Sequence, residues 1–308
     1  MAVQYKMVLL RFVRVVMQKT GPRPRISCDR AAHAIMPVMD ELIGTDVLYR
    51  LWAAPSAKAV FLLVHGLGAH SARWDFLASF LAGNGYASYG IELKGFGRTP
   101  ERPRGHIGSY RVWDRDILAL RETAARENPG RKVFLLGESL GGLVVFNLAA
   151  RYPDRFAGQV LISPAFKNGL KFPLSLYLAL PILMVIHPQK TVSLPFTSAM
   201  CTRDAAYQEV MDHNPDEVRV TSLSLLAKAL GEQMTASRRA KNLSVPSLFL
   251  IAGMDSLVDE RAGRKFFKKL TLQDKTLIEY PEMRHSLSIE LGRERVFEDI
   301  LAWVEKKA

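Results

Sequence analysis

The segment 137–141 reads Gly-Glu-Ser-Leu-Gly and places Ser139 between two glycines, each two residues away. The apolar residues 133–136 before it predict a short buried strand, and residues 143–152 after it predict a helix. On so abrupt a strand-to-helix turn the glycines avoid steric clashes, and the serine hydroxyl projects above the edge of a sheet. The pattern therefore predicts a nucleophilic serine, with the backbone N–H of Leu140 directed at a developing oxyanion.

A serine hydroxyl is a weak nucleophile at neutral pH, so it needs a neighbouring base and a group that orients this base. His285 is the best candidate base because it follows the predicted strand 276–280, at the same sheet edge as the serine. Asp255 comes soonest after the predicted strand 247–251 and is the preferred orienting acid. Asp259 is its rival, although its position beside another acid is typical of a solvated helix N-terminus. The chemistry indicated is acyl transfer by a serine, a histidine and an aspartate.

A second glycine-containing turn could complete such a site. The run His-Gly-Leu-Gly at 65–68 follows the buried apolar residues 60–64. Its glycines allow the Leu67 N–H to face the same developing oxyanion as the Leu140 N–H. Losing one such oxyanion donor typically costs ~3 kcal/mol. We expect His65 itself to be a packed structural histidine rather than a base. The histidines show no metal-ligand spacing, so the sequence predicts no metal.

The serine turn belongs to a longer alternation of apolar strands and amphipathic helices that begins near residue 45. Such an alternation predicts an α/β fold with a mostly parallel central sheet, helices on both faces, and chemistry beyond the carboxyl ends of the strands. The expected strands are residues 47–52, 60–64, 86–91, 133–136, 158–162, 247–251 and 276–280, and the expected helices are residues 73–81, 112–126, 143–152, 261–270 and 295–306.

Residues 164–242 interrupt this alternation and read as helical. Their most apolar part, residues 172–186, contains two prolines and is shorter than the ~20 residues that span a bilayer. We interpret the segment as an insertion over the active site, whose apolar face would line a pocket or touch lipid. A small helical subdomain with its own core is an equal alternative.

The motifs of residues 45–305 resemble those of the monoacylglycerol lipase and lysophospholipase branch of the α/β-hydrolases, which also includes serine aminopeptidases of the S33 type. The resemblance rests on the serine turn extended through Gly142, on residues 65–71, on Arg-Gly-His-Ile at 104–107, and on the turns that carry Asp255 and His285. The sequence departs from the pattern in places: the loop 92–97 reads Glu-Leu-Lys-Gly-Phe-Gly where the family usually has Asp-x-Arg-Gly-x-Gly, Glu138 stands where the family usually has a histidine, and Ala69 stands where it usually has a glutamate.

This resemblance implies the α/β-hydrolase fold with an inserted helical cap. It implies a catalytic triad of Ser139, Asp255 and His285, and an oxyanion hole formed by the backbone N–H groups of Leu67 and Leu140. With the residue patterns, the predicted organisation is an N-terminal segment and linker at 1–25, which lies outside the resemblance, a first part of the core at 26–163, the cap at 164–242 and a second part of the core at 243–308.

The chain has a net charge of +12, from 42 Lys and Arg against 30 Asp and Glu, which favours contact with an anionic surface. Zinc-finger spacing and RNA-binding signatures are missing, so we expect lipid headgroups rather than nucleic acid. In residues 1–20 basic side chains share one helical arc opposite an apolar face, which predicts a helix lying on an anionic membrane. A helix packed on the protein's own surface is an equal alternative. Cys28 and Cys201 indicate free thiols and fit a reducing, cytoplasmic compartment.

Together these features predict a serine carboxylic-ester hydrolase, an esterase or lipase that acts on a lipid-like ester through an acyl-enzyme on Ser139 and needs no cofactor. A serine peptidase of the same fold, acting on short peptides, is the alternative, and it would need acids that hold a free amino terminus. The acids between 204 and 217 look like helix-surface charges instead. A non-catalytic binding protein would usually lack a triad member, and all three are present.

Overall fold

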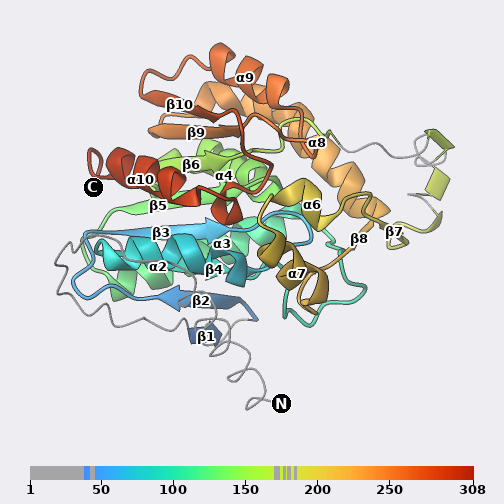
Figure 1. Cartoon of the computed structure of the whole chain (residues 1–308), viewed down its shortest axis with the longest axis horizontal. Coiled ribbons are helices and arrows are strands. Elements are labelled where there is room, and N and C mark those ends of the chain that lie inside the picture. Colours follow the sequence, from blue (N-terminus) through green and yellow to red (C-terminus); the bar gives the residue numbers. More distant parts are fainter. Residues whose placement is uncertain (1–37, 42–45, 170–173, 176–177, 179–181, 184–185) are drawn as a thin grey trace, which may run out of the picture. The chain divides into compact units, whose positions relative to one another are not determined.

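The computed structural model describes residues 38–41, 46–169, 174–175, 178, 182–183 and 186–308 (Figure 1). The amphipathic helix expected at 1–20 and Cys28 lie outside the described residues. Among the described residues, no helix is long and apolar enough to cross a bilayer.

One sheet of eight strands, in the order β1-β2-β4-β3-β5-β6-β9-β10, forms the centre of the fold. Six neighbouring strands, from β4 to β10, run parallel, and β2 pairs antiparallel with both β1 and β4. The predicted mostly parallel sheet is therefore confirmed. The strands are β1 (Val38–Glu41), β2 (Leu48–Trp52), β3 (Ala59–Val64), β4 (Tyr86–Ile91), β5 (Val133–Glu138), β6 (Gly158–Ile162), β9 (Ser247–Ala252) and β10 (Lys275–Tyr280).

Helices cover both faces of this sheet, as predicted. They are η1 (Ser71–Trp74), α2 (Asp75–Gly83), α3 (Tyr110–Glu127), α4 (Leu140–Arg151), η2 (Pro153–Arg155), α9 (Glu260–Lys269), η4 (Leu287–Ile289) and α10 (Arg293–Val304). Figure 1 shows α2 and α10 on the near side of the strands. The alternation of side chains along a strand explains the two layers, because neighbours point to opposite faces. In β3, Val60 and Leu62 join the core under α3 and α4, whereas Phe61 and Leu63 join the core under α2 and α10.

The interval between β6 and β9 adds no strand to the central sheet within the described residues. It contains α6 (Ser198–Cys201), α7 (Ala205–His213), α8 (Leu223–Arg239) and η3 (Ala240–Asn242), so the helical interpretation of this segment is largely right. It also contains a small antiparallel sheet of β7 (Thr191–Ser193) and β8 (Val220–Ser222), which the sequence did not indicate. Figure 1 shows α6 and α7 beyond the arrowhead of β3, at the edge where chemistry was expected.

Candidate active site

Ser139 occupies the sharp turn between β5 and α4. Its backbone has φ 59° and ψ −120°, a left-handed conformation that costs energy for any residue other than glycine. The flanking glycines make the turn possible, because a Cβ atom on Gly141 would collide with the carbonyl oxygens of Val64 and His65. The sheet also fixes the turn from the other side, since the N–H of Ser139 donates to the carbonyl of Ile162 at 2.9 Å. The strained turn thus holds the serine at the carboxyl edge of the sheet.

His285 and Asp255 come together as a buried pair in the loops after β10 and β9. The imidazole Nδ1 and the carboxylate Oδ2 are 2.7 Å apart, and both side chains are almost completely buried. The other oxygen, Oδ1, accepts hydrogen bonds from the backbone N–H groups of Leu257 (2.8 Å) and Val258 (3.0 Å). This geometry assigns the proton to Nδ1 and leaves Nε2 free to accept one.

The environment of His285 favours a charged imidazole. Burial alone would lower the pKa of His285, but the charge and hydrogen bond of Asp255, assisted by the charge of Glu138, raise it above the usual value. Asp259, the rival acid, lies elsewhere: its side chain caps the N-terminus of α9 and forms an ion pair with Lys167 at 2.7 Å. The structure therefore places Asp255, and not Asp259, beside the histidine.

A cavity of about 300 Å³ opens over the serine, at the lower end of the range usual for small-molecule sites. Ser139 and His285 both line it, and the Ser139 hydroxyl has no hydrogen-bond partner among the described residues. In ligand-free enzymes the hydrogen bond between a serine and its base is often long and tightens only when substrate binds. The insertion supplies most of the apolar wall, with Phe196, Cys201, Leu226, Ala229 and Leu230. The thiol of Cys201 is free and buried, as expected.

The two residues expected to form the oxyanion hole, Leu67 and Leu140, also line this cavity. Their turns approach each other so closely that a Cβ atom on Gly66 would lie 3.1 Å from the Cβ of Ser139. His65 holds the first turn: its Nε2 accepts from the N–H of Leu93 at 3.0 Å, so its Nδ1 donates to the carbonyl of Gly66 at 2.9 Å. Burial lowers the pKa of His65 to about 4. His65 is therefore a neutral structural histidine, as expected.

Two buried glutamates position the loop of His285; in the sequence analysis Glu138 was named only as a departure from the family pattern, and Glu290 was not named. Glu290 is fully buried and accepts from the N–H groups of Arg203 and Arg284, both at 2.9 Å. It therefore joins the insertion to the residue before the histidine. Glu138 accepts from the N–H and the hydroxyl of Ser288, at 3.2 and 3.1 Å. In the sequence these glutamates carry no signal of burial.

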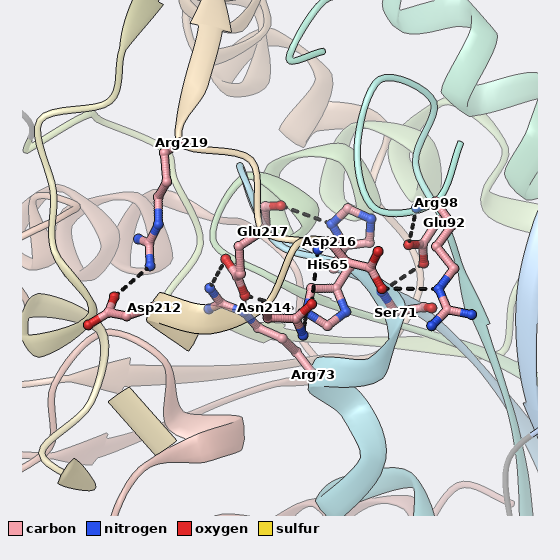
Figure 2. A network of polar contacts seen from close by, with 12 residues as sticks. His65, Ser71, Arg73, Glu92, Arg98, Asp212, Asn214, Asp216, Glu217 and Arg219 are labelled. Atoms are coloured by element: carbon pink, nitrogen blue, oxygen red, sulfur yellow. Dashed lines mark hydrogen bonds and ion pairs between the residues drawn. The ribbon is translucent and has the colours of Figure 1, made fainter. Parts of the chain in front are cut away.

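A third buried carboxylate, Glu217, fixes part of the insertion to the core (Figure 2). It accepts two parallel hydrogen bonds from Arg73 of η1, at 2.8 and 2.7 Å. Burial alone would raise the pKa of Glu217, but the charge of Arg73 and the hydrogen bonds of His70 and Arg73 lower it to about 2. The backbone strengthens this contact, because the N–H of Val218 donates to the carbonyl of Gly68 at 2.8 Å. The expectation that Glu217 is a surface charge is wrong, because its side chain is only 3% exposed.

Comparison with known proteins agrees with this architecture. A family model described as serine aminopeptidase, S33, matches residues 55–292. Human monoglyceride lipase is 29% identical over 294 residues, which cover 92% of this chain and 96% of the relative. The phospholipase YtpA of Bacillus subtilis is 30% identical over 259 residues, which cover 83% and 98%. The crystal structure of Paleococcus ferrophilus monoacylglycerol lipase superposes with a TM-score of 0.77 at 27% identity, covering 85% of this chain and 99% of that one. The chain therefore belongs to the serine aminopeptidase S33 family and is a hydrolase with the α/β-hydrolase fold, as its motifs predicted.

Proposed function

We propose that this hydrolase cleaves carboxylic esters of lipid-like alcohols through an acyl-enzyme on Ser139. The observation that carries the proposal is the convergence of a strained serine and an Asp255-bound histidine on one mainly apolar cavity. The relatives named monoglyceride lipase and phospholipase support the same class of substrate. An apolar wall built from the insertion suits a fatty acyl chain, because burial of each CH₂ group contributes about 0.8 kcal/mol.

The reaction follows from the roles of these groups. Nε2 of His285 takes the proton of Ser139 while the serine oxygen attacks the ester carbonyl carbon. The N–H groups of Leu67 and Leu140 stabilise the negative oxygen of the tetrahedral intermediate. The intermediate collapses, the alcohol leaves with the proton returned by His285, and an acyl-serine ester remains. Water then repeats these steps in place of the serine and releases the acid. The sequence of steps requires no cofactor.

Ester rather than peptide substrates are favoured by the state of the acids in the insertion. A peptidase needs free carboxylates in the cavity to hold an amino terminus, yet four of the five acids between 204 and 217 are paired with arginines, and the fifth, Glu209, does not line the cavity. Asp204 pairs with Arg293, Asp212 with Arg219, Asp216 with Arg98, and Glu217 with Arg73. None of these four acids belongs to the described lining of the cavity.

Hydrolysis of p-nitrophenyl esters of increasing chain length, and of monoacylglycerols, tests the proposal. Ser139→Ala should abolish turnover and fluorophosphonate labelling. Asp255→Asn should lower kcat by about 10³–10⁴-fold, as loss of the orienting acid does in serine hydrolases. Asp259→Asn is the matched control, because that acid lies on the neighbouring turn and should leave kcat close to wild type. Equal losses in both aspartate variants, or turnover that survives in the serine variant, would reject the assignment.

We also propose a cytoplasmic protein that contacts anionic membranes through residues 1–20, with the insertion as a cap over the site. The charge of +12 and the arrangement of basic side chains in this segment support the membrane contact. Deleting residues 1–22 should lower sedimentation with anionic liposomes, and high salt should weaken binding of the full chain by screening. Equal binding of both proteins would exclude this role for the segment.

A further inference from the structure

Glu138, which precedes the serine, is a buried carboxylate that makes no ion-pair contact among the described residues, although the more distant charge of Arg73 acts on it. Its side chain lines the cavity, and the residue is 5% exposed. Its two oxygens accept from the N–H and the hydroxyl of Ser288, which are neutral donors. In the described part of the chain no Lys, Arg or His forms an ion pair with it. Burying a carboxylate in this way is costly unless it is compensated, and burial accordingly raises the pKa of Glu138.

The compensating charge can come from the reaction itself. His285 lies three residues before Ser288 and lines the same cavity as Glu138. The imidazole is neutral when it acts as a base and becomes cationic once it has taken the serine proton. Three charged groups act on the imidazole of His285: Asp255 and Glu138 raise its pKa, and Arg73 lowers its pKa. Burial has the largest effect on the pKa of Glu138 and raises it, although the charge of Arg73, which lines the same cavity, already lowers it in part. The imidazolium adds a second positive charge only after proton transfer.

We propose that Glu138 is a positioning residue that holds the His285 loop through Ser288 and stabilises the imidazolium formed during ester cleavage. This inference rests on the proposed function. Interactions that strengthen in the transition state raise kcat, whereas interactions that are equal in both states do not. The charge of Glu138 is poorly balanced while His285 is neutral and better balanced once the imidazolium forms, so Glu138 stabilises the transition state more than the ground state.

Glu138→Gln separates the charge from the hydrogen bonds. The amide keeps an acceptor for the Ser288 N–H and a donor for its hydroxyl, so the loop keeps its support. Loss of the charge should lower kcat about tenfold with little change in KM, and should move the acid limb of kcat/KM about one unit to lower pH. The thermal midpoint should stay level or rise, because a costly buried charge is removed. A purely structural role would instead lower stability and leave the acid limb in place.

Ser288→Ala is the matched control. It removes one hydrogen bond of Glu138 but retains its charge, so the acid limb should keep its wild-type position. An NMR titration of His285 in wild type and in Glu138→Gln gives a readout that needs no substrate. If wild type shows no Ser139-dependent ester hydrolysis, the proposed function fails while the titration still decides the role of Glu138. An unchanged His285 titration in Glu138→Gln, or a variant that does not fold, would overturn the inference.

Discussion

Replacing Glu217 by glutamine should destabilise the protein strongly, although the residue lies outside the triad. The side chain accepts both hydrogen bonds of Arg73, whose own side chain is 7% exposed. Glutamine cannot neutralise the guanidinium, so Arg73 would remain buried and charged without its partner. Breaking one side of a buried pair typically costs about 3–5 kcal/mol, far more than a surface pair contributes.

The pKa of Glu217 gives a second estimate of the stability that this ion pair contributes. Its ordinary value of 4.5 falls to about 2 in the folded protein. At about 1.4 kcal/mol per pH unit, this difference corresponds to about 3 kcal/mol of stability. Because the folded pKa is depressed, this stability is present above pH 4.5 and is lost as the pH falls toward 2. The two routes agree in size.

Urea unfolding of wild type and Glu217→Gln at neutral pH measures the effect. Asp216→Asn is the matched control, because Asp216 is the adjacent residue and pairs with Arg98, which is 56% exposed. We expect the control to lose less than about 1 kcal/mol. The difference between wild type and Glu217→Gln should shrink as the pH falls from about 5 to 2. If Glu217→Gln loses no more stability than the control, or the difference is independent of pH, the ion pair does not hold the insertion as described.

Three further predictions concern the site. Gly141→Ala should lower the free energy of unfolding by about 3 kcal/mol or more and abolish ester hydrolysis, because the added Cβ would collide with backbone atoms. Gly83→Ala is the control and should be neutral, because its Cβ would meet open space. Equal melting temperatures of the two variants would contradict this. Ala229→Trp should fill the cavity and lower kcat/KM for long acyl chains more than for acetate, and an unchanged chain-length profile would place the acyl chain elsewhere. The acid limb of kcat/KM should have its midpoint above pH 6.5, because the pKa of His285 is raised and the base must be neutral to act; a midpoint below that value would contradict the pairing with Asp255.

The sequence predicted the central strands well, because a strand buried on both faces leaves a short continuous apolar run. The bounds of β4 (Tyr86–Ile91) and β6 (Gly158–Ile162) agree with the prediction to the residue. The helix after the serine begins at Leu140 rather than at residue 143, so its first turn contains two glycines. Tight packing against β3 requires glycine there and overrides its low helix propensity. Strands of three residues, such as β7, are too short to produce a periodic pattern.

The site could be predicted in part for a topological reason. The loops after parallel strands meet at one edge, so residues placed just after β5, β9 and β10 were expected to converge. The residues that support them could not be predicted. Arg73 and Glu217 are 144 positions apart in the sequence. The residues around a glutamate in a polar stretch do not reveal whether its side chain is buried or solvated. The roles of Glu138 and Glu290 were also not predictable, since only the folded chain brings the N–H groups of Ser288 and Arg284 to them.

The hydrogen bond from Val218 to Gly68 has a thermodynamic consequence. Through it, the turn that carries Leu67 and a piece of the insertion are ordered together before any ligand arrives. Association then loses little protein conformational entropy on this side, and the ordering cost falls mainly on the flexible tail of the ligand. Selectivity among ligands that contact this part of the cavity should therefore depend on how many rotatable bonds of each ligand lose their freedom on binding.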